Sequence, residues 1–335
     1  MLFRFFRLIF FIRWEVTFLC AGYKIRGMIT TAGGINMRLA NIVVAAWALA
    51  SLAAIGAAQG AGIHYHGVAS FTKRVPHLRS SYAYVVDQQN GLTLYAKKPE
   101  VRTPIASITK LMTAMVVLDA HLRLGKKITI AAVDKDRVKN TVSRLRIGTR
   151  LSRQELLQLA LMSSENRAAA ALAHSYPAGY AAFIAAMNRK ARQLSMTHTH
   201  FVDPTGLHSA NQSTAEDLAK MVKAAYRYPL IRRITTTRHY TVETKRAALP
   251  YRNTNILVRN HRWKIGLSKT GFINEAGHCL VMQARIAHRP IIIVLLDSVG
   301  KYSRIGDANR IKHWIEHNEP AFTAALRRRI AANNS

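Results

Sequence analysis

Strand-like segments lie near both ends of the chain, and helical segments fill the middle. Residues 82–87 and 92–97 flank Asn90-Gly91, a pair that favours a hairpin turn because both residues tolerate positive φ. Three more strand-like runs come late in the chain, at residues 264–269, 279–284 and 291–296. This order predicts an α/β fold of the α+β type, with an antiparallel sheet built from both ends of the chain and flanked by helices.

Apolar residues at helical spacing predict the central helices. One helix is expected from about Ser107 to Leu122, and the capping box Ser152-Arg153-Gln154-Glu155 begins another. Further helices are expected at about residues 166–174, 181–194, 215–226 and 307–317. For the basic tail at residues 319–335, frayed disorder is favoured over an amphipathic helix.

The first part of the chain has the pattern of an export signal. Within residues 37–61, an uncharged run rich in Ala, Val and Leu follows Arg38 and ends in small residues, which predicts a cleaved signal peptide in preference to a retained anchor. We interpret residues 1–36 as an upstream extension that is not normally made, with a membrane-surface helix as the alternative. Residues 62–80 then form a linker to one catalytic domain at residues 81–318.

The charge of the chain is strongly basic. The formal net charge is +32, and it remains +27 when residues 1–61 are left out. Such a protein is drawn to polyanions, of which nucleic acid is the first candidate. The export signal argues against nucleic acid and favours peripheral contact with anionic wall polymers or membrane surfaces, although a merely solvated basic surface fits equally well.

Cysteine and histidine do not indicate a disulfide or a metal site. Cys20 lies in the segment expected to be absent, so Cys279 has no partner and is expected to be a buried thiol. The close histidine pairs, at residues 64–66 and 198–200, come without an H-E-x-x-H or Cys-x-x-Cys motif. We therefore expect neither a metal nor a cofactor.

Three short motifs follow one another in a fixed order. Ser107-Ile108-Thr109-Lys110 (S-x-x-K) begins a helix, Ser164-Glu165-Asn166 (S-x-N) lies at a break between helices, and Lys269-Thr270-Gly271 (K-T-G) ends a strand. Each motif alone is common by chance. Their joint occurrence, each in a fitting local structure, indicates a nucleophilic serine enzyme.

The spacing of the first motif suits nucleophilic catalysis. Residues three apart share a helix face, so the Lys110 amine can reach the Ser107 hydroxyl, and the helix N-terminus helps to stabilise an oxyanion. Lys110 is a base only when neutral, and burial together with a second cation, Lys269, would lower its pKa.

The other two motifs supply residues that handle the substrate. Ser164 can relay a proton to the leaving amine, and Asn166 can hold a substrate amide. Lys269 and Thr270 can bind a substrate carboxylate, while Gly271 leaves room for a substrate strand.

The segments around these motifs resemble the low-molecular-mass penicillin-binding proteins, a family of serine DD-peptidases, and most of all its D-alanyl-D-alanine endopeptidases of the penicillin-binding protein 7 type. The similar segments are residues 105–115, 161–169, 201–207, 252–255, 269–272 and 277–282. The resemblance implies a β-lactamase-like fold and an oxyanion hole formed by the backbone N–H groups of Ser107 and Phe272. It also implies hydrolysis of peptidoglycan cross-links through an acyl-Ser107 intermediate, and inhibition by β-lactams.

Some features depart from the family or leave alternatives open. The middle motif is S-E-N where S-D-N is usual. The chain ends soon after the last expected helix, without the second β domain and C-terminal anchor usual in the carboxypeptidases, which favours a soluble periplasmic enzyme. The alternatives are a D-alanyl-D-alanine carboxypeptidase, a β-lactamase, and a penicillin-binding wall protein without turnover. No glutamate can be assigned to β-lactamase deacylation.

Overall fold

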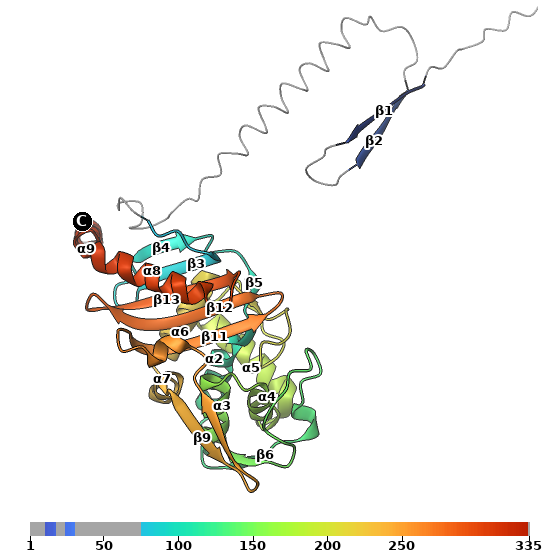
Figure 1. The fold of residues 1–335 in the computed structure, drawn as a ribbon, viewed down its shortest axis with the longest axis vertical. Coiled ribbons are helices and arrows are strands. Elements are labelled where there is room, and N and C mark those ends of the chain that lie inside the picture. Colours follow the sequence, from blue (N-terminus) through green and yellow to red (C-terminus); the bar gives the residue numbers. More distant parts are fainter. Residues whose placement is uncertain (1–10, 18–23, 31–74, 334–335) are drawn as a thin grey trace, which may run out of the picture. The chain divides into compact units, whose positions relative to one another are not determined.

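The computed structural model describes residues 11–17, 24–30 and 75–333, and the chain divides into two units, residues 1–63 and 64–335 (Figure 1). In the first unit, strands β1 (Phe11–Thr17) and β2 (Lys24–Thr30) pair antiparallel. At these residues, the alternative of a membrane-surface helix was therefore wrong. The predicted signal peptide and most of the predicted linker lie outside the described residues.

A five-stranded antiparallel sheet is the centre of the second unit. Its strand order is β11-β12-β13-β3-β4, and its strands are β3 (Ser80–Asp87), β4 (Thr93–Lys97), β11 (Lys264–Ile273), β12 (Gly277–Ile286) and β13 (Arg289–Ser298). The sheet thus joins the early hairpin to the three late strands, as the sequence predicted.

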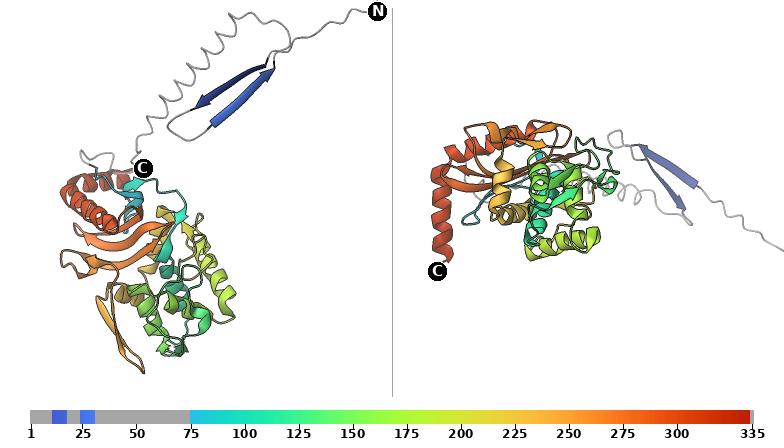
Figure 2. Two further views of the ribbon diagram at one scale, coloured as in Figure 1. Left: turned by 45° about the vertical axis from the view of Figure 1, so that its right-hand side comes forward. Right: turned by 90° about the horizontal axis from the view of Figure 1, so that it is seen from below.

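Both faces of this sheet are buried. Along β13, Ile291, Ile293 and Leu295 belong to one hydrophobic cluster, whereas Ile292 and Val294 belong to the other. Successive side chains of a strand point to opposite faces, so an unbroken apolar run requires cover on both sides. The views in Figure 2 show the C-terminal helices on one side of the sheet and most of the other helices on the opposite side.

Helix α8 (Ser303–His317) packs on β12 and β13 and is followed by α9 (Glu319–Asn333). Phe322 of α9 is fully buried and meets Trp314 of α8 edge-on, with ring centroids 5.0 Å apart. The expectation of disorder was wrong for residues 319–333, because Phe322 anchors α9 to the body, with Ala325 and Leu326 packed against the same cluster and Thr323 accepting a hydrogen bond from Arg289.

The opposite face carries the other helices, with one exception. They are η2 (Ala106–Thr109), α2 (Lys110–Asp119), η3 (Ala132–Asp134), α3 (Arg153–Met162), α4 (Asn166–His174), α5 (Gly179–Gln193), α6 (Ala215–Ala225) and α7 (Pro229–Thr236). The exception is η4 (Ile256–Arg259), whose Leu257 belongs to the same hydrophobic cluster as α8. α2 lies among α3, α4, α5 and α6, and α6 packs on the sheet. The site residues carried by η2 and α2 therefore lie on a well-supported element.

Three short strand pairs complete this layer: β5 (Thr103–Pro104) with β8 (Gln212–Ser213), β6 (Lys127–Thr129) with β7 (Arg150–Ser152), and β9 (His239–Glu243) with β10 (Ala248–Arg252). The sequence did not predict any of these pairs. The β9–β10 hairpin extends away from the five-stranded sheet of the second unit (Figure 1).

The last residues of the predicted linker belong to the folded body. Leu78 is 2% exposed, and the Ser80 backbone N–H donates a hydrogen bond of 2.7 Å to Asp307 of α8. The Ser80 hydroxyl donates a second one, of 2.6 Å, to the same carboxylate oxygen. The packed structure thus begins before residue 81. Among the described residues, no helix combines the length and the apolarity needed to cross a membrane.

Candidate active site

Ser107 and Lys110 lie at the junction of η2 and α2. Ser107 is in the 3₁₀ turn, and Lys110 is the first residue of α2 and fully buried. The Lys110 amine donates hydrogen bonds to Ser107 Oγ at 2.8 Å, to Asn166 Oδ1 at 2.7 Å and to the Thr205 carbonyl oxygen at 2.6 Å. The predicted pairing of Lys110 with Ser107 is thus present.

The partners of Lys110 define how a neutral amine would be oriented. The Asn166 and Thr205 oxygens can only accept hydrogen bonds, whereas the Ser107 hydroxyl can also donate. A neutral amine has two N–H groups, so it would give both to these oxygens and turn its lone pair to Ser107. Burial lowers the pKa of Lys110 to about 7, although the carboxylates of Asp203, Glu165 and Asp136 oppose this shift.

The S-x-N motif forms the turn between α3 and α4. Ser164 has a φ of 61°, a left-handed conformation that is costly for a residue with a side chain. Glu165 caps α4 by accepting a hydrogen bond from the Arg167 backbone. The Asn166 amide nitrogen donates to Thr141 Oγ1 at 3.0 Å, which orients its oxygen toward Lys110.

The K-T-G motif lies on β11. Lys269 is 1% exposed, and its amine donates to Ser164 Oγ and to the Thr270 carbonyl, each at 2.9 Å. Burial holds the pKa of Lys269 well below its usual range, and the charges of Lys110 and Arg304 lower it further. The repulsion between the two lysines thus acts on Lys269, while burial is the main cause of the lowered pKa of both. Thr270 donates to Thr254 Oγ1 at 2.7 Å.

Gly271 marks the closest approach between β11 and η2. A Cβ at this residue would lie 3.1 Å from the Ser107 backbone nitrogen and 2.9 Å from the Ile105 carbonyl oxygen. The need for glycine therefore comes from the packing of β11 on the nucleophile turn, a reason that the sequence did not reveal. Phe272 is 52% exposed, and its ring stacks on His278 with centroids 4.3 Å apart.

A cavity of about 490 Å³ connects the three motifs. Of the predicted site residues, it is lined by Ser107, Ser164, Asn166, Thr270, Gly271 and Phe272. The two remaining predicted residues, Lys110 and Lys269, are buried and hydrogen-bond to the serines that line it. All eight predicted residues thus lie at one site.

Two further contributors were not predicted. The turn at residues 203–206 was expected only to support the cleft, but its Thr205 carbonyl also accepts a hydrogen bond from Lys110. The Asp203 carboxylate fixes the shape of this turn by accepting hydrogen bonds from the backbone N–H groups of Thr205 and Gly206. Arg304 of α8 lines the cavity, with Nη1 3.5 Å from the Gly271 carbonyl oxygen. Only the likeness of residues 201–207 to the family hinted at the first contributor, and no motif hinted at the second.

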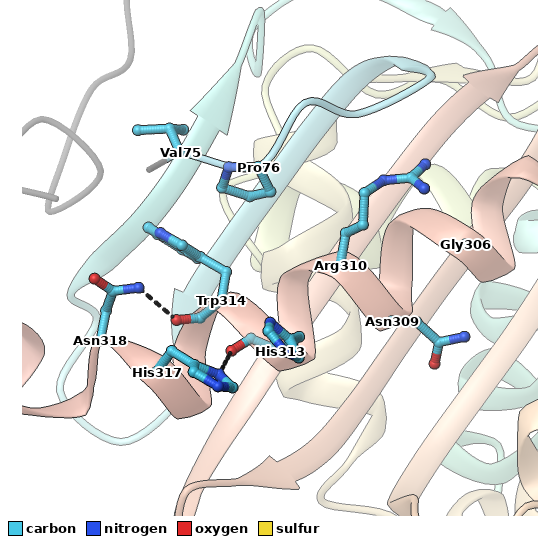
Figure 3. A pocket seen from close by; sticks show the side chains of 9 residues that line it. All are labelled: Val75, Pro76, Gly306, Asn309, Arg310, His313, Trp314, His317 and Asn318. Atoms are coloured by element: carbon cyan, nitrogen blue, oxygen red, sulfur yellow. Dashed lines mark hydrogen bonds between the residues drawn. The ribbon is translucent and has the colours of Figure 1, made fainter. Parts of the chain in front are cut away.

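A larger hollow, of about 810 Å³, lies along α8 and carries none of the motifs (Figure 3). His313 and His317 stack there with centroids 3.9 Å apart, and His317 Nδ1 lies 2.7 Å from the His313 carbonyl oxygen. The described residues that line this hollow include these two histidines but no serine, threonine, cysteine or lysine that a base could activate as a nucleophile. Among the described residues, no group of three or more His, Cys, Asp or Glu side chains could hold a metal ion. Chemistry, and not size, therefore identifies the cavity at Ser107 as the candidate site.

Comparison with known proteins agrees with this site. Residues 69–300 match the sequence model of the family described as D-alanyl-D-alanine carboxypeptidase, peptidase family S11. The chain belongs to this family. The serine DD-peptidase class predicted from the motifs is thereby confirmed.

Relatives and solved structures extend the comparison. The chain is 48% identical over 262 residues to the D-alanyl-D-alanine endopeptidase of Escherichia coli K12, covering 77% of this chain and 84% of the relative. It is 48% identical over 256 residues to the D-alanyl-D-alanine endopeptidase of Pseudomonas aeruginosa, covering 75% and 83%. The Streptomyces K15 DD-transpeptidase matches with a TM-score of 0.67 and 32% identity, covering 71% of this chain and 97% of that one. The predicted DD-peptidase fold is thus confirmed.

Proposed function

We propose that this DD-peptidase is an endopeptidase that hydrolyses D-alanyl cross-links in peptidoglycan through an acyl-Ser107 intermediate. The observation that carries this proposal is the 48% identity to two relatives, each named D-alanyl-D-alanine endopeptidase, over about three quarters of the chain. The arrangement of the three motifs around one cavity supports it.

Acylation begins at Ser107. Its oxygen attacks the D-alanyl carbonyl carbon, and the hydroxyl proton passes to the neutral Lys110 amine, which lies 2.8 Å away. The backbone N–H groups of Ser107 and Phe272 hold the negative oxygen of the tetrahedral intermediate. The closeness of residue 271 to the Ser107 nitrogen supports this role, because it brings the next amide of β11 to the same place.

The intermediate collapses when its carbon–nitrogen bond breaks. The proton taken from Ser107 is returned to the leaving nitrogen with Ser164 as the relay, and the Lys269 amine holds the Ser164 hydroxyl in place at 2.9 Å. Water then attacks the ester, which releases the acid and restores the Ser107 hydroxyl.

Substrate positioning falls to the rim of the cavity. Asn166 holds a substrate amide, and Thr270, Lys269 and the half-buried guanidinium of Arg304 attract a substrate carboxylate. Since β-lactams present a similar carbonyl and carboxylate, they acylate Ser107 as covalent inhibitors.

The proposed site of action is the periplasm. This assignment is supported by the signal-peptide pattern at residues 37–61 and by a cell-wall substrate. The excess of basic residues supports peripheral attraction to polyanions, and the export signal favours anionic wall polymers or membranes over nucleic acid.

The deciding experiment compares two substrates. The purified enzyme is assayed on a cross-linked muropeptide dimer and on a monomeric pentapeptide, and kcat/KM is determined for each. We expect the dimer to be preferred. A pentapeptide preference above about tenfold, or about 1.4 kcal/mol in transition-state binding, would contradict the endopeptidase proposal.

A carboxypeptidase is the second candidate, because the matching family model has that description. Both activities would use the same acyl-Ser107 intermediate and would differ only in the amine that leaves. Release of free D-alanine from the pentapeptide, without cleavage of the dimer, would establish this second activity.

A further inference from the structure

A second groove, strongly basic, lies between residues 144–150 and the tip of the β9–β10 hairpin. It has a volume of about 630 Å³. Five cationic side chains and one carboxylate, that of Glu243, line it; the cationic residues are Arg144, Arg146, Arg150, Lys245 and Arg246. None of the five takes part in an ion pair with a described residue. The groove therefore has several positive charges that an anionic ligand could neutralise.

The walls of this groove are anchored to the body. The Arg144 guanidinium lies 3.9 Å from the ring centroid of Tyr251, a buried residue of β10. The Leu145 carbonyl accepts a hydrogen bond from Arg167 of α4, the residue that follows the S-x-N motif. The arginines thus extend from a fixed segment, which limits the entropy lost when a ligand binds.

The same two chain segments line the groove and the Ser107 cavity. In the first segment, Thr141 lines the cavity and Arg144, three residues later, lines the groove. In the second segment, Leu249 lines the groove and Thr254, five residues later, lines the cavity. Since an extended chain spans at most about 3.5 Å per residue, the first pair of Cα atoms lies within about 11 Å and the second within about 18 Å. A bound peptide of about five extended residues can therefore reach from the Ser107 cavity to the groove.

We propose that this groove binds the free carboxylates of the second stem peptide, the one whose side-chain amine is expelled from the D-alanyl carbonyl carbon when Ser107 is acylated. This inference rests on the proposed endopeptidase function. Four of the five cations are arginines, whose planar guanidinium matches a carboxylate with two parallel hydrogen bonds. A monomeric pentapeptide has no second stem peptide, so the groove distinguishes cross-linked from terminal substrates.

The test uses two double variants of the full mature enzyme that each remove two positive charges. Arg146→Gln with Arg246→Gln alters the groove, whereas Arg192→Gln with Arg285→Gln alters exposed arginines elsewhere, on α5 and β12. Each variant is assayed on a muropeptide dimer with free carboxylates and on the same dimer with those carboxylates amidated. Acylation by a labelled penicillin, followed for every variant, reports the state of the Ser107 cavity.

We expect the groove variant to raise KM for the acidic dimer about tenfold, well beyond any change in penicillin acylation. The effect should weaken in high salt, and amidation of the dimer should raise the wild-type KM similarly. The control variant should behave as wild type.

Two outcomes would overturn the inference. One is an equal response of the groove and control variants. The other concerns binding of each variant to polyphosphate, measured in parallel. If the groove variant hydrolyses the dimer at the wild-type rate but no longer binds polyphosphate, the groove belongs to a phosphate polymer. If wild type cleaves the pentapeptide but no dimer, the proposed function itself fails, a result distinct from both.

Discussion

Lys110 Nζ lies 2.8 Å from Ser107 Oγ, and its other two hydrogen-bond partners are oxygens that cannot donate. The lone pair of a neutral Lys110 amine would therefore face the Ser107 hydroxyl, the one partner of the three that can donate a hydrogen bond. In the proposed mechanism, the reactivity of Ser107 therefore depends on the protonation of a single buried lysine.

The rate of Ser107 acylation should therefore depend on pH. The pKa of Lys110 is lowered to about 7, so the amine is protonated and inactive well below that pH and becomes a base above it. We expect penicillin acylation to rise with pH and to level off above a midpoint near pH 7. A rate that stays flat between about pH 5.5 and pH 8.5 would contradict this assignment of the base.

Lys110→Arg should abolish acylation, because an arginine keeps its proton at working pH and cannot accept one from Ser107. Incubation with labelled penicillin followed by mass spectrometry should find no adduct, as in Ser107→Ala. Lys223→Arg, at an exposed position of α6, is the matched control and should react normally. Labelling of Lys110→Arg at the wild-type rate would refute the proposal.

Gly271→Ala should slow acylation by about a hundredfold, because the added Cβ pushes the Ser107 backbone from its position. Stopped-flow measurement with a chromogenic cephalosporin gives the rate. In the control Gly125→Ala, the new Cβ meets no atom within 4 Å, and the rate should stay at the wild-type value. If both variants react alike, the close packing of β11 on η2 has no catalytic importance.

Phe322→Ala should lower the free energy of unfolding by about 3–5 kcal/mol, because it removes a fully buried aromatic ring from the contact with Trp314. Urea denaturation followed by tryptophan fluorescence measures this loss. Arg328→Ala, at an exposed position of the same helix, should change the stability by less than about 0.5 kcal/mol. Equal stabilities of the two variants would show that the contact of Phe322 with Trp314 does not stabilise the fold.

The sequence predicted the parts of this structure that depend on local pattern. The core strands are continuous apolar runs between turn residues, and the caps at Ser152 and Thr214 begin helices at the expected positions. The eight candidate site residues could be found because their side-chain chemistry is bound to short, fixed spacings.

Features that depend on remote contacts were missed. The Thr205 oxygen that accepts a hydrogen bond from Lys110 belongs to the backbone, and every residue type has such an oxygen, so the sequence cannot single it out. Arg304 reaches the cavity from a helix with no motif of its own. Helix α9 is held by the buried ring of Phe322 together with smaller contacts of Thr323 and Leu326, none of which belongs to a motif. Only the folded chain brings these groups to their partners.

The strand order also has a consequence for how the protein folds. β3 pairs with β13, and Ser80 is tied to Asp307 across 227 residues, so the sheet closes only after a very long loop has been ordered. Contacts of such sequence separation form slowly, because the entropy of loop closure must be overcome first. The turn that carries Ser107 belongs to the early part of the chain, and β11, which packs against it, belongs to the late part. The site that we propose to react with penicillin is therefore assembled late in folding.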